Sequence, residues 1–319
     1  MSEYLLEVKD LKKHFDSPKG NLHAVDGISF TLQKGKSLGI VGESGCGKST
    51  TGRTILRLVE PTSGTILFEG KDITKLSRRE MTKMRKDMQI IFQDPFSSLD
   101  PKMPISKLIS EPLLQTKMSK KEIEQRVREL METVGLPPRL YNAYPHELDG
   151  GRRQRVGIAR ALALNPKFIV CDEPVSALDV SIQAQILNLL KQLQRERELT
   201  YIFITHDLSV IYYFADEIAV MYLGKIVEKA PAEELFANPM HPYTRALLSA
   251  IPEPKLNSTR KRILLKGEIA SAIGLPGGCR FASRCEYCCE DCRSKEPELV
   301  EVSEGHFVAC CRPLSNAEA

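Results

Sequence analysis

Short apolar runs alternate with amphipathic stretches along most of this chain. Buried-type strands are predicted at residues 37–41, 168–171, 201–205 and 218–221, where apolar residues follow one another. An amphipathic helix is predicted over 180–193, between the second and third of these strands. Such alternation predicts an α/β domain with a parallel sheet covered by helices on both faces.

The N-terminal region adds further strand-like runs at 5–9, 28–32 and 66–68, each bordered by glycine. The strand at 37–41 leads directly into a glycine-rich loop, and a helix is predicted to follow over 48–58. This strand, loop and helix order is the context in which a glycine-rich loop binds phosphate.

A helical insertion is predicted at about 97–164. Ser119 and Glu122 have the spacing of a capping box, and they precede an apolar face at helical spacing. That face consists of Ile123, Val127, Leu130, Met131 and Val134. Prolines then interrupt the pattern, and the main domain boundary is predicted near Pro254, which gives a domain over 1–254 and an extension over 255–319.

The composition describes a soluble globular protein, with 42% apolar residues, 27% charged residues and a net charge of +4. No run of about 18 apolar residues occurs, and the N-terminus lacks the plan of a secretory signal. We therefore expect a cytosolic chain that reaches a membrane only through partners. The basic residues around 78–86 fit a solvated helix face better than a nucleic-acid site.

The loop at 42–50 reads Gly-Glu-Ser-Gly-Cys-Gly-Lys-Ser-Thr and fits the pattern of a nucleotide-binding P-loop. Its glycines allow successive backbone N–H groups to point at phosphate oxygens, and the helix that follows adds its positive end. Lys48 is placed to neutralise the β- and γ-phosphates, and the Ser49 hydroxyl is placed to bind Mg²⁺.

Two carboxylates end the strand at 168–171. A charge at the position of Asp172 is costly to bury unless it is paired or binds a metal, and Mg²⁺ supplies the compensation. Glu173 is expected to point toward the γ-phosphate and to polarise the attacking water as a general base. The sequence therefore predicts an enzyme that binds and hydrolyses ATP.

Several further motifs resemble those of the ATP-binding subunits of ABC transporters. Residues 144–155 resemble the family signature, residues 176–179 its D-loop, Gln93 its Q-loop glutamine, and His206 its switch histidine. Phe15 lies where the family has the aromatic residue that stacks on adenine. The resemblance implies an N-terminal antiparallel β-subdomain, Lys48, Glu173 and His206 as catalytic residues, and Mg²⁺ bound by Ser49, Gln93 and Asp172. The implied nucleotide-contacting residues are Phe15, Gly42, Ser44, Gly45, Cys46, Gly47, Lys48, Ser49, Thr50, Gln93, Asp149, Gly150, Gly151 and Asp179.

The segment 241–248 and the cysteines after it resemble the C-terminal extension of the dipeptide, oligopeptide and nickel importers, most closely that of their F-type subunit. This implies a peripheral protein at the cytoplasmic face of the membrane that powers peptide import. The implied partners are a second, non-identical ATPase subunit of the D type, two membrane permeases and an extracytoplasmic substrate-binding protein, with no nucleic acid. Import of nickel or another chelated metal is the alternative. A soluble ABC ATPase and a module with a dead nucleotide site are further alternatives, but the chain lacks the second cassette or long coiled coil of the former and keeps the catalytic residues that the latter loses.

The signature departs from the family pattern. Asp149 stands where the family has serine, and Arg152 stands where it has glutamine. In the family two subunits face each other head to tail, and the serine donates a hydrogen bond to the γ-phosphate held by the opposite P-loop. An ionised Asp149 cannot donate, and two like charges about 4 Å apart repel by roughly 4 kcal/mol at an effective dielectric constant near 20. Arg152 or a raised pKa of Asp149 offsets part of this repulsion. We therefore expect poor hydrolysis at the site that uses this signature.

Seven of the nine cysteines lie between 279 and 311. A reducing cytosol disfavours disulfides there. The spacing of Cys279, Cys285, Cys292 and Cys310 matches that of the subfamily extension, and four thiolates could hold a [4Fe–4S] cluster. Zinc is an alternative, because Cys285 with Cys288 and Cys289 with Cys292 form C-x₂-C pairs. Buried free thiols are the third possibility.

Overall fold

The computed structural model describes residues 3–18, 20–94, 96–251, 262–267, 272–275 and 277–314. The predicted boundary at Pro254 lies outside these residues. The chain forms two compact units, the first made of Met1–Leu32, Ser37–Lys75 and Thr205–Ala319 and the second of Gln33–Lys36 and Leu76–Ile204. No helix in the described ranges is both long and apolar enough to cross a bilayer.

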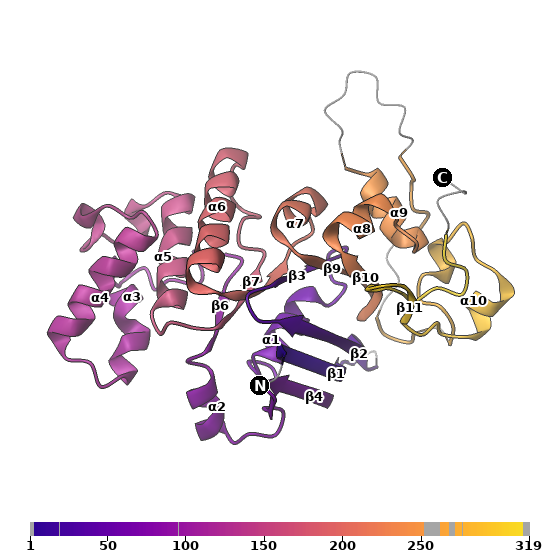
Figure 1. Cartoon of the computed structure of the whole chain (residues 1–319), viewed down its shortest axis with the longest axis horizontal. Helices are drawn as coiled ribbons and strands as arrows, with labels where there is room; N and C mark the ends of the chain where they lie inside the picture. Colours follow the sequence, from indigo (N-terminus) through magenta and orange to yellow (C-terminus); the bar gives the residue numbers. More distant parts are fainter. Residues whose placement is uncertain are drawn as a thin grey trace. The chain divides into compact units, whose positions relative to one another are not determined.

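The first unit contains a four-stranded sheet in the order β2-β1-β4-β5. Strands β1 and β4 are antiparallel and pair Leu6 with Phe68, as expected for the N-terminal subdomain. Figure 1 shows β2, β1 and β4 side by side. The strands are β1 (Tyr4–Phe15), β2 (Leu22–Gln33), β4 (Ser63–Phe68) and β5 (Lys71–Asp72).

A second group of strands in this unit follows the order β11-β12-β10-β9-β3. The predicted parallel pairing is confirmed for β3 and β9. Beyond β9 the sheet continues through β10, β12 and β11, which pair antiparallel and which the sequence did not predict. A two-residue turn causes the reversal: Leu223 and Gly224 have φ angles of 43° and 80°, the left-handed pair that closes a tight hairpin. The strands are β3 (Ser37–Val41), β9 (Glu217–Tyr222), β10 (Lys225–Pro231), β11 (Val300–Ser303) and β12 (His306–Val308).

Short helices complete the first unit. The helix after the glycine-rich loop ends at Ile55, earlier than the predicted 58, because Arg57 takes a left-handed φ of 50°. The helices are α1 (Lys48–Ile55), α7 (Leu208–Phe214), α8 (Ala232–Ala237), α9 (Pro242–Ser249), the 3-10 turn η4 (Ala282–Arg284) and α10 (Glu290–Ser294).

The second unit holds the parallel strands β6 (Met88–Ile91), β7 (Phe168–Asp172) and β8 (Thr200–Ile204), with β7 between the other two. Every residue of β7 and β8 is buried, as continuous apolar runs predict. Its helices are α2 (Arg78–Met84), α3 (Ile105–Ser110), α4 (Lys120–Thr133), α5 (Gly150–Leu162) and α6 (Val180–Arg197), with 3-10 turns η1 (Glu111–Gln115), η2 (Pro138–Leu140) and η3 (Pro145–Glu147).

The predicted helical insertion is a packed group of α3, α4 and α5 (Figure 1). The capping box at the start of α4 is confirmed, because the Ser119 hydroxyl accepts from Glu122 N and the Glu122 carboxylate accepts from Ser119 N. Val127, Leu130, Met131 and Val134 are buried, and Ile123 is half-buried, so the predicted apolar face is the packed one.

Candidate nucleotide-binding site

The candidate site residues fall into two groups, one in each unit. Phe15, the glycine-rich loop and His206 belong to the first unit, and Gln93, Asp149, Asp172, Glu173 and Asp179 belong to the second. Each group has its own internal geometry.

The glycine-rich loop joins β3 to α1, and its backbone requires glycine. Gly42, Gly45 and Gly47 have φ angles of 152°, 79° and 105°. A Cβ atom on Gly47 would lie 2.0 Å from the Ala24 carbonyl oxygen, and one on Gly42 would lie 2.2 Å from the Met221 carbonyl oxygen. The loop therefore combines left-handed backbone with close contacts to its neighbours, and no larger residue fits at either position.

Lys48 reaches back over this loop. Its side chain is 4% exposed, and Nζ donates to the carbonyl oxygens of Gly42 at 2.8 Å and Glu43 at 3.0 Å. No side chain caps the N-terminus of α1, and its first turn carries no acidic residue. A cation and the positive end of a helix therefore meet at one loop, which is the arrangement that binds phosphate.

Phe15 and His206 occupy exposed positions in the same unit. The Phe15 side chain is 38% exposed at the end of β1, and Lys13 Nζ lies 4.6 Å from its ring centroid. His206 follows Thr205, whose N–H donates to the Ile40 carbonyl oxygen at 3.2 Å. Asp207 then caps α7 by accepting from Ser209 N at 2.8 Å. Fixed residues on both sides therefore hold His206 at the surface.

The acidic pair lies at the end of β7 in the second unit. Asp172 is 1% exposed, and Glu173 is half-buried with a left-handed φ of 47°. Glu173 N donates to the Ile204 carbonyl oxygen at 2.9 Å, and Gln93 Nε2 donates to Glu173 Oε2 at 3.0 Å. The structure therefore brings together the predicted Q-loop glutamine and the predicted general base.

Asp149 and Asp179 both begin helices. Asp149 Oδ1 accepts from Arg152 N at 2.7 Å, and Arg152 NH1 lies 3.2 Å from Asp149 Oδ2. Asp149 is thus the N-cap of α5, and Arg152 partly neutralises it. Asp179 caps α6 by accepting from Ile182 N at 3.0 Å. The Ser181 hydroxyl and this backbone bond lower the pKa of Asp179. A Cβ on Gly151 would lie 2.6 Å from Ile182 Cγ2, so a larger residue there would force Ile182 to shift.

The C-terminal cysteines lie near one another. Cys279 N donates to the Cys292 carbonyl oxygen at 2.7 Å, and a Cβ on the preceding Gly278 would lie 2.4 Å from that oxygen. Burial raises the pKa of the thiols of Cys285 to about 11 and of Cys310 to about 12, and the thiol of Cys279 contributes to both shifts. Cys292 Sγ lies 3.4 Å from Cys289 Sγ, and burial raises the pKa of Cys292 to about 12. The backbone therefore ties Cys279 to Cys292.

Sequence reasoning missed one charged cluster, on the hairpin next to Phe15. His14 Nε2 lies 2.9 Å from Asp26 Oδ1, His23 Nδ1 lies 3.3 Å from Asp26 Oδ2, and the Arg280 guanidinium donates to the same carboxylate. Burial raises the pKa of Asp26, but the bonds from Arg280 and His14 outweigh this and lower it to about 2. The side-chain nitrogen and oxygen atoms of His14, His23 and Asp26 that could bind a metal lie within 4.8 Å of one another. The guanidinium on the carboxylate already supplies the compensating charge, so the trio is a structural ion-pair network.

Comparison with protein families supports the sequence resemblance. Residues 25–176 match the ABC transporter family, and residues 227–292 match the oligopeptide/dipeptide transporter C-terminal region. The oligopeptide transport ATP-binding proteins AppF and OppF of Bacillus subtilis are 51% and 52% identical to this chain, each over 97% of both chains. A putative peptide import ATP-binding protein of Brucella ovis is 52% identical over 97% of this chain and 98% of its own length.

Solved structures of ABC cassettes share the fold. The cbiO1 protein of Clostridium perfringens, part of the cbiONQ transporter complex, aligns with a TM-score of 0.67 and 32% identity over 74% of this chain and 92% of its own. The cassette MJ0796 bound to ADP and Pi aligns with a TM-score of 0.65 and 31% identity over 71% of this chain and 98% of its own.

Proposed function

The chain belongs to the ABC transporter ATP-binding family, and we propose that it is the ATP-hydrolysing subunit of an importer of dipeptides or oligopeptides. One observation carries this proposal: about half of the residues are identical to those of oligopeptide transport ATP-binding proteins, across 97% of the chain. That similarity includes the C-terminal region typical of peptide transporters.

In the proposed site the glycine-rich loop holds the triphosphate. Lys48 Nζ, now bonded to the carbonyl oxygens of Gly42 and Glu43, would exchange these neutral acceptors for phosphate oxygens. Phe15 would stack on the adenine. The buried carboxylate of Asp172, the hydroxyl of Ser49 and the amide of Gln93 are oxygen donors that suit Mg²⁺. When bound, Mg²⁺ would neutralise charge on the β- and γ-phosphates.

The hydrolytic step is assigned to Glu173. Its carboxylate would accept a proton from the attacking water, while the amide of Gln93, at 3.0 Å, orients that carboxylate. His206, exposed after the strand β8, would contact the γ-phosphate.

The proposed partners are a second, non-identical ATPase subunit, two permeases and an extracytoplasmic substrate-binding protein, at the cytoplasmic face of the membrane. Purification of the assembled complex followed by uptake into vesicles tests this. We expect ATP-dependent uptake of labelled dipeptides or oligopeptides. Uptake of labelled nickel without peptide uptake would instead favour the metal importer, and the absence of any co-purifying permease would contradict the transport proposal.

Asp149 provides a prediction about the second ATP site of the proposed dimer. In a complex that carries Glu173→Gln in this chain, the remaining turnover comes from the partner's P-loop opposite Asp149. There, Asp149→Ser is expected to raise ATP turnover by roughly tenfold, because it removes part of a repulsion of about 4 kcal/mol and restores a donor. The rate of phosphate release measures this ATP turnover.

Asp149→Asn is the matched control for charge alone. Asp, Asn and Ser are all good N-caps, so α5 should remain intact in all three proteins. We expect Asn to give an intermediate rate. Equal or lower turnover in both variants would show that Asp149 does not limit this site.

For the cysteines of the extension we propose a [4Fe–4S] cluster held by Cys279, Cys285, Cys292 and Cys310. Four Zn–S bonds of about 2.3 Å would bring the sulfurs of a zinc site to about 3.8 Å from one another. Among the described residues no three cysteine sulfurs lie within 4.8 Å of one another. The proposal of the cluster rests on the spacing of these four cysteines along the chain.

Absorbance of anaerobically purified protein tests the cluster. We expect a broad band near 400 nm and bound iron, both lost in Cys285→Ser. Cys311→Ser, at an exposed cysteine outside the proposed ligand set, is the control and should keep the band. Colourless protein that contains zinc would support the alternative metal, and colourless protein without metal would support free thiols.

A further inference from the structure

Two buried arginines of the C-terminal extension contact the N-terminal part of the first unit. Arg280 and Arg284 lie between Cys279 and Cys285, in the segment that includes the turn η4. Arg280 is only 8% exposed and Arg284 only 7% exposed. Buried guanidinium groups need acidic or carbonyl partners, so the groups they contact are informative.

Arg284 binds the glycine-rich loop itself. Its NH1 lies 2.7 Å from Glu43 Oε2, and its NH2 donates to Glu43 Oε1 at 3.1 Å. This is a two-point guanidinium–carboxylate pair, the geometry that gives the strongest and most directional ion pairs. Hydrogen bonding to Glu43 raises the pKa of Arg284, so the guanidinium keeps its positive charge.

Every polar group of Glu43 is fixed. Its N–H donates to the Tyr243 hydroxyl at 2.9 Å, and its carbonyl oxygen accepts from Lys48 Nζ at 3.0 Å and from Cys46 N at 3.3 Å. When Lys48 leaves this carbonyl for a phosphate, the contacts with Arg284, Tyr243 and Cys46 N remain. The extension and α9 therefore hold the loop in shape at the moment it binds its ligand.

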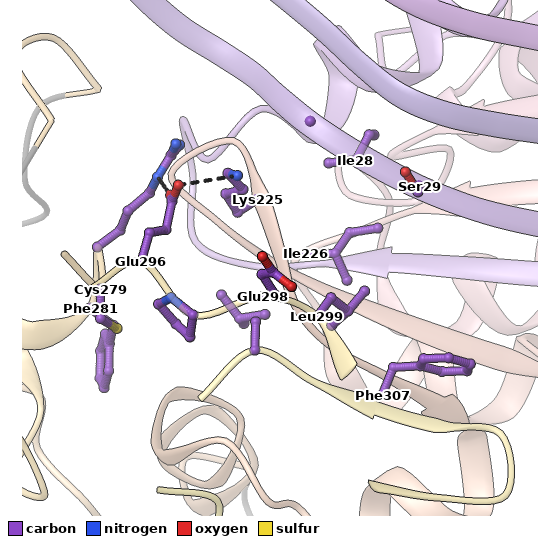
Figure 2. A pocket seen from close by; sticks show the side chains of 15 residues that line it. Ile28, Ser29, Lys225, Ile226, Cys279, Phe281, Glu296, Glu298, Leu299 and Phe307 are labelled. Atoms are coloured by element: carbon purple, nitrogen blue, oxygen red, sulfur yellow. Dashed lines mark hydrogen bonds and ion pairs between the residues drawn. The ribbon is translucent and has the colours of Figure 1, made fainter. Parts of the chain in front are cut away.

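Arg280 contacts strand β2, next to the strand β1 that ends at Phe15. It donates to Asp26, to the Leu223 carbonyl oxygen and, through Nε, to Glu296 Oε1 at 3.0 Å. Figure 2 shows Glu296 reaching toward Lys225 at one end of a cavity of about 580 Å³ between the strands and the extension. Beside this cavity, the ion pair of Arg280 with Asp26 joins the extension to β2.

We propose that Arg284 is a positioning residue of the ATP site, which it serves by ordering the glycine-rich loop and by neutralising the carboxylate of Glu43. Without that neutralisation, Glu43 would present a negative charge on the loop that must accept a polyanion. The proposal rests on the ATPase function and adds the C-terminal extension to the residues that set nucleotide affinity.

Substitutions separate the two proposed effects of Arg284, which are the ordering of the glycine-rich loop and the neutralisation of Glu43. Arg284→Gln leaves the Glu43 charge uncompensated and is expected to weaken MgATP binding by about tenfold, whereas Glu43→Gln alone should change it by less than about threefold. The double variant should bind within about threefold of wild type, because no charge then remains to be neutralised. Arg284→Lys keeps the charge without the two-point geometry and should be intermediate.

Titration of the full chain with MgATP against a fluorescent nucleotide, at low and high salt, measures these affinities. The defect of Arg284→Gln should shrink at high salt, and in the assembled complex it should appear in KM far more than in kcat. Lys266→Gln removes an exposed cation of the extension, 3.6 Å from Glu286, and should bind like wild type. Thermal melts check that each variant is folded.

The proposal is overturned if folded Arg284→Gln binds MgATP within twofold of wild type. It is equally overturned if the double variant binds MgATP no better than Arg284→Gln alone. A merely structural role for the Arg284–Glu43 pair predicts that result. Wild-type protein that binds no MgATP would contradict the proposed function itself, which is a separate outcome.

Discussion

Replacement of Glu173 by Gln is expected to lower ATP turnover of the assembled complex by about a hundredfold or more, which is the contribution typical of a general base. The amide keeps the size of the side chain but cannot take a proton. MgATP binding should remain close to wild type, because the contacts of the glycine-rich loop are untouched. Phosphate release and nucleotide titration together measure the two effects.

The surroundings of Glu173 fix its backbone, so Glu173→Gln should change the side chain's chemistry without moving it. Its backbone is held in a left-handed conformation by the Ile204 carbonyl oxygen at 2.9 Å, while Ser176 donates to the Glu173 carbonyl oxygen through its hydroxyl at 3.1 Å. Strained backbone of this kind persists only where neighbours fix it, and it clusters at functional sites. Glu198→Gln, at an exposed pair with Lys34 in the same unit, is the control and should keep full turnover. Near-normal turnover in Glu173→Gln would show that another group is the base.

The sequence was sufficient for features whose residues are close together in the chain. The glycine-rich loop needs only residues 42–50 and its flanking strand and helix, and the cap of α4 needs only Ser119 and Glu122. Hydrophobic runs gave the buried strands β7 and β8 for the same reason. Local spacing carries the physics of these elements, so pattern alone predicts them.

Contacts between distant residues could not be predicted in this way. Glu43 contacts Tyr243 and Arg284 across 200 and 241 positions, and the motif at 241–248 gave no indication that Tyr243 contacts the glycine-rich loop. The antiparallel edge formed by β10, β12 and β11 was also missed, because the turn at Leu223 and Gly224 carries no strong hairpin dipeptide.

The second large effect is expected at Glu228, a carboxylate that is 0% exposed. It accepts from Met240 N at 2.7 Å, His241 N at 3.0 Å and His306 Nε2 at 2.8 Å, and so joins β10 to the start of α9 and to β12. Glu228→Ala would leave these donors buried without a partner. We expect the free energy of unfolding to fall by about 3–5 kcal/mol and the melting temperature by roughly 10 °C. Lys9→Gln, which removes an exposed ion pair with Glu7 in the same unit, is the control and should cost far less.

The pH dependence of stability tests the same network. Burial alone lowers the pKa of His306, but the bond to Glu228 and its charge, with Glu234 nearby, outweigh burial and raise it. The protonated pair therefore adds stability fully below the unfolded histidine pKa of about 6.5, and loses it as pH rises through the raised folded value. His241 acts oppositely: burial lowers its pKa to about 4, so it costs stability as pH falls from about 6.5 toward 4. Melting temperatures of wild type and His306→Gln should therefore converge as pH rises above neutral and diverge below it, and a difference that grows at high pH would contradict a charged His306–Glu228 pair.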